Sequence, residues 1–176
     1  MNMNSNNFSR LAAMDRPSPD DIRQLAGSFD TGRPDAILDF QGSDRFLSNF
    51  YDTPIVYEGI LYKNAEAAFQ AQKAKTAQGR MAYSSLSASA AKRQGRREDL
   101  RPDWEDVKIT EMYRIVRAKF TQSETLAWRL LDTGDKPLVE GNTWNDVFWG
   151  VCRGKGENWL GVILMAVRNI LRSACG

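Results

Sequence analysis

The chain has 176 residues, a length typical of a single domain. Lysine and arginine number 24 against 22 aspartate and glutamate, so the net charge of +2 gives no general argument for a nucleic-acid partner. Histidine is absent, which excludes histidine-based triads, histidine general bases and most transition-metal sites. Acid–base chemistry must therefore rest on carboxylates, lysines or tyrosines.

The expected compartment follows from what the sequence lacks. The two cysteines, Cys152 and Cys175, indicate neither a disulfide framework nor a zinc site. No apolar run approaches the roughly 20 residues of a membrane-spanning helix. The start of the chain also lacks the basic end and apolar stretch of a signal peptide. We therefore expect a cytoplasmic protein with no membrane partner.

The first 35 residues differ in composition from the rest of the chain. Their Asn/Ser-rich opening predicts disorder. Ser18-Pro19-Asp20-Asp21 then combines an N-cap, a proline at the first helical position and two acids, which predicts a short helix over about 19–26. We expect residues 1–35 to be a partly disordered extension and residues 36–174 to be the domain.

The domain is expected to begin with a strand over residues 36–40 and an aromatic-rich loop over 46–51. Residues 54–57 and 60–62 flank Glu58-Gly59, a two-residue hairpin signal. Asn64 then caps a helix that is expected to run to about Lys75.

The second half of the chain is expected to be mainly helical. Ser87, Asp103 and Ser123 stand at predicted helix starts, and apolar residues recur after them at three- and four-residue steps. The predicted elements are helices over 88–94, 102–120, 123–134 and 158–172 and short strands over 138–140 and 147–149. Neither an internal repeat nor a βαβ alternation occurs. The predicted class is α+β, a mostly helical single domain with a few short strands.

Glu66 and Lys73 are the first candidate pair. Seven residues separate them, which places both on one face of a helix, roughly 10 Å apart along its axis. Gln70 lies between them. A carboxylate in the first helical turn is also favoured by the helix dipole whatever the function, so the spacing permits a site without requiring one.

Two further segments carry candidate chemistry. In Glu140–Gly150, two tryptophans and a phenylalanine alternate with short polar side chains, which fits either ring stacking with hydroxyl recognition or a turn packed on the core. Gly150–Asn158 is rich in glycine and contains Arg153 and Lys155, which fits either a phosphate site before a helix or a flexible loop. The basic run Lys92–Arg101 fits phosphate binding or a solvated turn.

Taken together, these segments resemble the NADAR (YbiA-like) family. The resemblance extends over about residues 38–172 and rests on an ordered set of motifs: Phe46-Leu47-Ser48-Asn49-Phe50, Asn64-Ala65-Glu66-Ala67-Ala68-Phe69-Gln70-Ala71-Gln72-Lys73, Ala91-Lys92-Arg93-Gln94-Gly95-Arg96, Leu100-Arg101-Pro102-Asp103-Trp104, Arg117-Ala118-Lys119-Phe120, Glu140, Asn145-Asp146, Trp149-Gly150 and Gly154-Lys155-Gly156-Glu157-Asn158-Trp159-Leu160-Gly161. Residues 1–35 lie outside it.

The resemblance implies a YbiA-like fold and an N-glycosidase that splits a ribose C1–nitrogen bond. It implies that the substrate is a ribosylamino-pyrimidine phosphate of flavin biosynthesis or ADP-ribose attached to guanine, with ADP-ribosylated DNA as one form. By position, Glu66, Lys73 and Asp146 are the expected catalytic residues. The expected substrate-binding residues are Ser48, Asn49, Phe50, Gln70, Arg96, Trp104, Lys119, Glu140, Asn145, Trp149, Gly150, Gly154, Lys155, Gly156 and Asn158.

Two mechanisms fit these residues. Glu66 or Asp146 stabilises an oxocarbenium-like transition state and deprotonates the attacking water; alternatively, Lys73 attacks C1 and passes through an imine. Neither route requires a metal or an organic cofactor. The rival hypotheses are a non-catalytic module that binds ADP-ribose or NAD, and a nucleic-acid binder that uses Lys92–Arg97 with Trp144 and Trp149. The oligomeric state is not defined by the sequence.

Overall fold

The computed structural model describes residues 5–175, and its secondary structure is mainly helical with a few short strands, which confirms the expected fold class. No helix in this part of the chain is long and apolar enough to cross a membrane. The elements are α1 (Ser5–Ala13), α2 (Pro19–Ala26), a 3-10 helix η1 (Gly42–Leu47), β1 (Asp52–Tyr57), β2 (Ile60–Asn64), α3 (Ala65–Ala71), α4 (Ala77–Met81), α5 (Ala88–Gly95), α6 (Trp104–Thr121), α7 (Glu124–Asp132), β3 (Gly141–Asn142), β4 (Val151–Cys152) and α8 (Trp159–Cys175).

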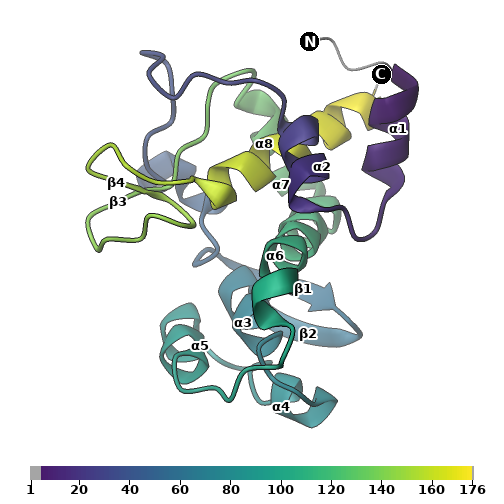
Figure 1. Ribbon diagram of the computed structural model, residues 1–176, viewed down its shortest axis with the longest axis vertical. Helices are drawn as coiled ribbons and strands as arrows, with labels where there is room; N and C mark the ends of the chain where they lie inside the picture. Colours follow the sequence, from purple (N-terminus) through teal and green to yellow (C-terminus); the bar gives the residue numbers. More distant parts are fainter. Residues whose placement is uncertain (1–4, 176) are drawn as a thin grey trace.

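Helix α6 connects the two halves of the molecule. It contacts α8, α7 and α2 on one side and α3 and strand β1 on the other (Figure 1). Ile115 and Phe120 of α6 and Ile163 and Leu164 of α8 are fully buried in the core between these elements. Burial of such side chains is the main favourable term for the fold.

The predicted hairpin is confirmed. Strand β1 pairs antiparallel with β2, and Tyr57 lies opposite Ile60 across the turn Glu58-Gly59. Both turn residues have positive φ, 48° for Glu58 and 75° for Gly59, as a type I′ turn requires. Pro54, which cannot donate a ladder hydrogen bond, lies where the register of the two strands shifts.

The N-terminal region is more ordered than its composition predicted. Residues 5–13 form α1, so disorder was a wrong prediction there; residues 1–4 lie outside the described part of the chain. Arg10 and Ala12 belong to residue types that favour helix, and Ala12 packs against the core. Helix α2 forms as predicted with a capping box at Ser18, and its Ile22 and Leu25 are buried against the core.

The remaining predicted helix starts at Ser87, Asp103 and Ser123 are confirmed within one or two residues. The strands predicted at 36–40, 138–140 and 147–149 are wrong. The first two of these segments share a single bridge, between Ile37 and Leu138. In this part of the chain the paired strands are instead β3 and β4, which run parallel. Phe40 and Leu138 are buried, so the apolar patterns there reflect packing of loops on the core.

Helix α3 is shorter than predicted. It was expected to run to about Lys75, but it ends at Ala71 with Gln72 as its C-cap. The amides of Gln72, Lys73 and Ala74 each bond to a carbonyl three residues earlier, so the chain tightens into a 3-10-type turn. Lys73 therefore lies in this turn, beyond the helix that carries Glu66.

Candidate active site

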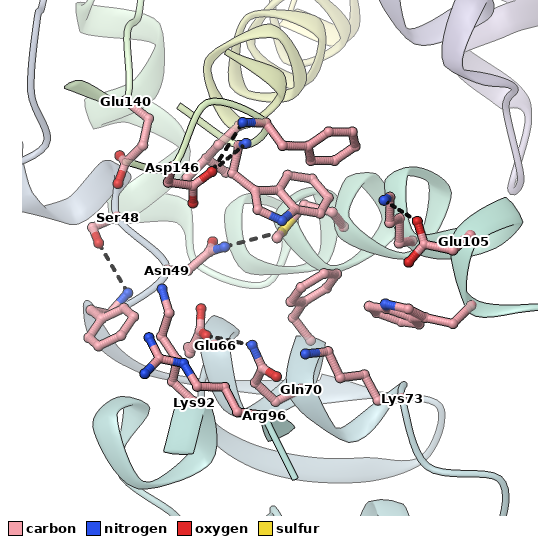
Figure 2. Close-up of a pocket in the computed structure, with 18 residues that line it drawn as sticks. Ser48, Asn49, Glu66, Gln70, Lys73, Lys92, Arg96, Glu105, Glu140 and Asp146 are labelled. Atoms are coloured by element: carbon pink, nitrogen blue, oxygen red, sulfur yellow. Dashed lines mark hydrogen bonds and ion pairs between the residues drawn. The ribbon is translucent and has the colours of Figure 1, made fainter. Parts of the chain in front are cut away.

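A cavity of about 360 Å³ contains most of the residues singled out in the sequence (Figure 2). It lies where α3, α5 and α6 meet the loops around residues 48–50 and 140–149. The residues that were predicted from the sequence and that line the cavity are Ser48, Asn49, Phe50, Glu66, Gln70, Lys73, Arg96, Trp104, Glu140, Asp146 and Trp149. Among residues 5–175, no group of three or more Cys, Asp or Glu side chains is placed to hold a metal ion.

Glu66 is held at the floor of this cavity by its neighbours in the chain. Asn64 caps α3 by accepting a hydrogen bond of 2.8 Å from the amide of Ala67, which fixes the first turn. Gln70 Nε2 donates to Glu66 Oε1 at 2.8 Å, and the Glu66 amide donates to Asn49 O at 3.0 Å. Only 5% of Glu66 is exposed, and burial raises the pKa of its carboxyl against the opposing effect of Lys92.

Lys73 also lines the cavity, although it is not on the helix. Its Nζ donates to Gly95 O at 3.3 Å and lies 5.7 Å from the centroid of the Trp104 ring. Burial lowers the pKa of Lys73, while the Glu66 carboxylate acts in the opposite direction. The 3-10-type turn thus brings the amine into the same cavity as the carboxylate by a different geometry from the one the sequence predicted.

Asp146 organises the opposite wall. Its Oδ1 accepts hydrogen bonds from the amides of Phe148 at 3.2 Å and Trp149 at 2.9 Å. These bonds occupy the backbone donors that a strand over 147–149 would have needed, which explains why no strand forms there. Asn142 fixes Asp146 further, because its side chain bonds to both the amide and the carbonyl of that residue.

Both backbone groups of Glu140, a residue of the cavity wall, are hydrogen-bonded. Asn158 Oδ1 accepts from the Glu140 amide at 3.0 Å, and the Glu140 carbonyl accepts from Val151 at 2.8 Å. Its Oε2 atom is buried and has no hydrogen-bond partner among the described residues. Burial, followed by repulsion from Asp146, raises the pKa of Glu140 to about 7. A buried polar atom without a partner costs about 1–3 kcal/mol, so Glu140 Oε2 is available to a hydrogen-bond donor that enters the cavity.

Asn49 and Gln70 also contain unpaired acceptor atoms, Oδ1 and Oε1. The Gln70 oxygen packs against Gly95, where an added Cβ would lie 1.9 Å from it. Glycine at position 95 is therefore needed for the close approach that orients the Gln70 amide toward Glu66. The Asn49 oxygen, like Glu140 Oε2, belongs to a residue of the cavity wall and can accept a hydrogen bond from a hydroxyl group of a ligand.

Aromatic rings form one end of the cavity. Phe69 packs against Trp104 and Trp149, with ring centroids 5.2 Å apart in both pairs. Phe148 lies 4.9 Å from Trp149 at an interplanar angle of 87°. The two ring positions of Trp104 and Trp149 were predicted from the sequence, whereas Phe69 and Phe148 were not assigned to the site. Such rings present faces on which a planar base can stack.

Cations from α5 lie beside the carboxylates. Lys92 lines the cavity and its Nζ lies 5.4 Å from the centroid of the Phe50 ring, while Arg96, one helical turn further on, lines the same wall. Lys92 was not among the predicted site residues, because the basic run that contains it was interpreted first as a solvated turn. The lining residues missed by the sequence prediction are Phe69, Lys92, Glu105, Lys108, Met112, Phe148 and Leu160.

Lys119 does not line the cavity. It is only 1% exposed, and its Nζ donates to the carbonyl of Ser48 at 2.8 Å, which supports the loop that forms one wall. Burial lowers the pKa of Lys119 to about 7, against the attraction of Glu140. In this structure Lys119 supports the loop that carries Ser48.

The glycine-rich loop does not reach the cavity. Cys152 and Lys155 bond to each other through their backbone groups, and Glu157 N donates to Val147 O, so these amides are not free to bind an anion. Besides Lys119, the predicted binding residues that lie outside the cavity are Asn145, Gly150, Gly154, Lys155, Gly156 and Asn158. Gly150 and Gly156 instead allow close backbone packing: a Cβ on Gly150 would lie 2.2 Å from Glu140 O, and one on Gly156 would lie 2.1 Å from Gly150 O.

The fold and the cavity together define the class of protein: a small α+β domain with a cavity that combines carboxylates, aromatic rings and cations. The NADAR domain model matches residues 39–172. The N-glycosidase YbiA of Escherichia coli (strain K12) is 39% identical over 144 residues, which cover 78% of this chain and 89% of that protein. The chain therefore belongs to the NADAR family, which confirms the resemblance read from its motifs.

Two further comparisons support this assignment. A riboflavin biosynthesis protein of Vibrio vulnificus is 38% identical over 135 residues, which cover 72% of this chain and 35% of that protein. The NMR structure of the E. coli protein YbiA superimposes with a TM-score of 0.72 and 36% sequence identity, covering 81% of this chain and 89% of that chain. YbiA is thus similar to this chain in both sequence and fold.

Proposed function

We propose that this protein is an N-glycosidase that hydrolyses the ribose C1–N bond of a phosphorylated nucleoside-like substrate. The observation that carries the proposal is that Glu66, Glu140 and Asp146 line one cavity together with aromatic rings and cations (Figure 2). Cleavage of this bond develops positive charge at C1 and the ring oxygen, which nearby carboxylates stabilise. Family membership and the N-glycosidase relatives support the same reaction.

Glu66 is the proposed general base. Gln70 occupies one of its carboxylate oxygens, which leaves the other available to a water molecule in the cavity. Its raised pKa improves proton acceptance near neutral pH, since a general base works best when its pKa lies near the operating pH. Glu66 removes the proton from water as the water oxygen bonds to C1.

Glu140 is the proposed general acid. With a pKa of about 7 it holds a proton in a large share of molecules at neutral pH, and its Oε2 has no partner among the described residues. It transfers that proton to the departing nitrogen as the C1–N bond breaks. Asp146, oriented by the amides of Phe148 and Trp149, supplies the fixed negative charge that stabilises the transition state.

Lys73 offers an alternative route. Because burial lowers its pKa, a larger fraction of its amine is neutral than for a free lysine. The neutral amine can attack C1 and displace the base nitrogen, which leaves with the proton held by Glu140, while the lysine nitrogen loses its extra proton to Glu66. The lysine-linked ribose then opens to an imine, and water hydrolyses the imine to release the sugar. Borohydride reduction during turnover separates the two routes. The imine route predicts a sugar adduct on Lys73, whereas the direct route predicts no adduct on any lysine and undiminished activity after treatment.

The remaining lining residues support binding of the substrate. Trp104 and Trp149 offer ring faces to a base, and Lys92 and Arg96 offer positive charge to a phosphate group. Because relatives include proteins named for riboflavin biosynthesis, we propose a ribosylamino-pyrimidine phosphate as the first substrate class and ADP-ribosylated guanine, free or in DNA, as the second. We also propose a cytoplasmic location, with which the free thiol of Cys152 is compatible.

The proposal is tested by incubating the purified protein with each of the two substrates. The expected result is release of the free base or amine together with a reducing sugar phosphate in equal amounts. If the protein releases neither product at any pH but still binds ADP-ribose, the rival hypothesis of a non-catalytic binding module replaces this one.

A further inference from the structure

Helix α2 lies before the NADAR domain in the sequence but belongs to the same core in the structure. It ends at Ala26, whereas the domain match begins at residue 39. Its Ile22 and Leu25 are at most 1% exposed, and the helix packs against α8 (Figure 1). Asn169 of α8 donates to Leu25 O at 2.9 Å and to Ala26 O at 3.2 Å, which satisfies carbonyls at the end of α2. Apolar packing and hydrogen bonds therefore both hold α2 on α8.

Arg23 extends from this helix to the ring of Trp159, the first residue of α8. Its guanidinium carbon Cζ lies 4.0 Å from the centroid of that ring, and its Nη2 lies 3.7 Å from Glu157 Oε2. The same glutamate oxygen accepts a hydrogen bond from Trp159 Nε1 at 2.8 Å. The three side chains therefore form one cluster, in which the cation contacts both the ring and the carboxylate.

Trp159 connects this cluster to the aromatic end of the cavity. Its amide donates to Phe148 O at 3.2 Å, and the amide of the next residue, Leu160, donates to Trp149 O at 2.9 Å. The rings of Trp159 and Phe148 lie 6.5 Å apart at an interplanar angle of 36°. Phe148 in turn packs against Trp149, and both of these rings line the cavity. A displacement of the Trp159 ring would therefore reach the cavity through a single intervening ring.

The ion pair by itself does not account for this arrangement. The side chains of Arg23 and Glu157 are 47% and 54% exposed, and pairs of such exposed charges contribute little to stability. A planar guanidinium beside the indole instead restricts the orientation of the ring. A tilt of Trp159 would break its contact with the cation and its hydrogen bond to Glu157 together, so the cluster holds the ring in one orientation.

We propose that Arg23 is a positioning residue for the cavity. From an element outside the NADAR domain it fixes the ring of Trp159 and, through that ring, the Phe148 and Trp149 rings at one end of the cavity. Arg23 does not line the cavity, so it takes no part in the chemical step. The effect on activity rests on the proposed function, whereas the effect on the rings does not depend on it.

NMR spectra of the indole N–H groups test the positioning in the whole protein without a substrate. The chain has five tryptophans, whose indole signals can be assigned one by one. We expect Arg23→Ala to shift the signals of both Trp159 and Trp149, and Arg23→Lys to restore them only in part, because an ammonium group lacks the planar face of a guanidinium. Arg172→Ala is the matched control, because Arg172 is 46% exposed and pairs with Asp135, and none of the cation–ring contacts in the described part of the chain includes it. A shift confined to Trp159, or equal shifts in Arg172→Ala, would overturn the proposal.

The kinetics of base release give a second readout. Rings that only hold the substrate bind its ground state and its transition state alike, so their displacement raises KM and leaves kcat unchanged. We expect Arg23→Ala to raise KM about two- to fivefold, as loss of one exposed cation–π contact predicts, and Arg172→Ala to leave KM unchanged. A KM equal to that of wild type in Arg23→Ala, with only a lower urea midpoint, would show a purely structural contact and contradict the proposal. If even wild type releases no base, the proposed function fails, and the indole signals alone decide whether Arg23 positions the rings.

Discussion

Asp146 has two roles that two substitutions can separate. Its Oδ1 accepts hydrogen bonds from the amides of Phe148 and Trp149, and the carboxylate also supplies negative charge to the cavity. In Asp146→Asn the amide oxygen can still accept both hydrogen bonds, so the turn is retained and the charge alone is lost. In Asp146→Ala both amides lose their acceptor and the charge is lost as well.

The expected magnitudes differ accordingly. Loss of one preorganised electrostatic group lowers kcat by about 10²–10³-fold, which we expect for both variants. Hydrogen bonds to a charged acceptor contribute about 1.5–3 kcal/mol each, but water can replace part of this in a half-buried turn. We therefore expect Asp146→Ala to lose about 1–3 kcal/mol in the free energy of unfolding, and Asp146→Asn to stay within about 0.5 kcal/mol of wild type.

Urea unfolding followed by tryptophan fluorescence measures the stability of each variant, and base release under saturating substrate measures kcat. Wild-type kcat in Asp146→Asn would refute the role of the charge. Equal unfolding midpoints for the two variants would refute the role of the carboxylate as acceptor for the turn.

Three other outcomes are expected. Because the pKa of Glu140 is raised to about 7, the folded protein keeps a proton that the unfolded chain releases near the ordinary glutamate pKa. Both kcat and the free energy of unfolding should therefore fall as the pH rises toward and through 7. Glu140→Gln should remove this fall from the pH profiles of both quantities. Gly95→Ala should displace the Gln70 amide, whose Oε1 would lie 1.9 Å from the new Cβ, and lower kcat by about 10²-fold with little change in the unfolding midpoint. Glu111→Ala should lower the free energy of unfolding by about 3 kcal/mol in urea, because Glu111 is 2% exposed and pairs with Arg114 and two other arginines; a loss under about 0.5 kcal/mol would contradict this.

Local signals in the sequence predicted much of the fold. The caps at Ser18, Asn64 and Ser87 each stand at an observed helix start, because a side-chain acceptor for the first amides is a short-range property. The two-residue turn at Glu58-Gly59 is equally local. Elements whose partners lie far away in the chain were less predictable, since the strands expected at 36–40 and 138–140 share only the bridge between Ile37 and Leu138. The strand expected at 147–149 failed for a local reason, because Asp146 accepts hydrogen bonds from the amides of Phe148 and Trp149.

The residues of the candidate site were likewise predicted only in part. The motif order identified Glu66, Asp146 and Trp149, and all three line the cavity. The glycine-rich loop misled the prediction, since glycines needed for close backbone packing, as at Gly156, follow the same pattern as glycines that approach a phosphate. Lys92 was ambiguous because a basic run does not reveal which of its side chains faces inward; only the packing of α5 on α3 decides that.

The central claim is that Glu66 takes part in breaking the ribose C1–N bond, and Glu66→Gln tests it most directly. Glu124→Gln is the matched control, because Glu124 also lies in the first turn of a helix, α7, but is exposed and outside the cavity. The measurement is the rate of base release from a ribosylamino-pyrimidine phosphate and from ADP-ribosylated guanosine by the three proteins. We predict that wild type and Glu124→Gln release the base from at least one of them at equal rates, while Glu66→Gln is about 10²–10⁴-fold slower. A rate for Glu66→Gln within twofold of wild type would contradict the account.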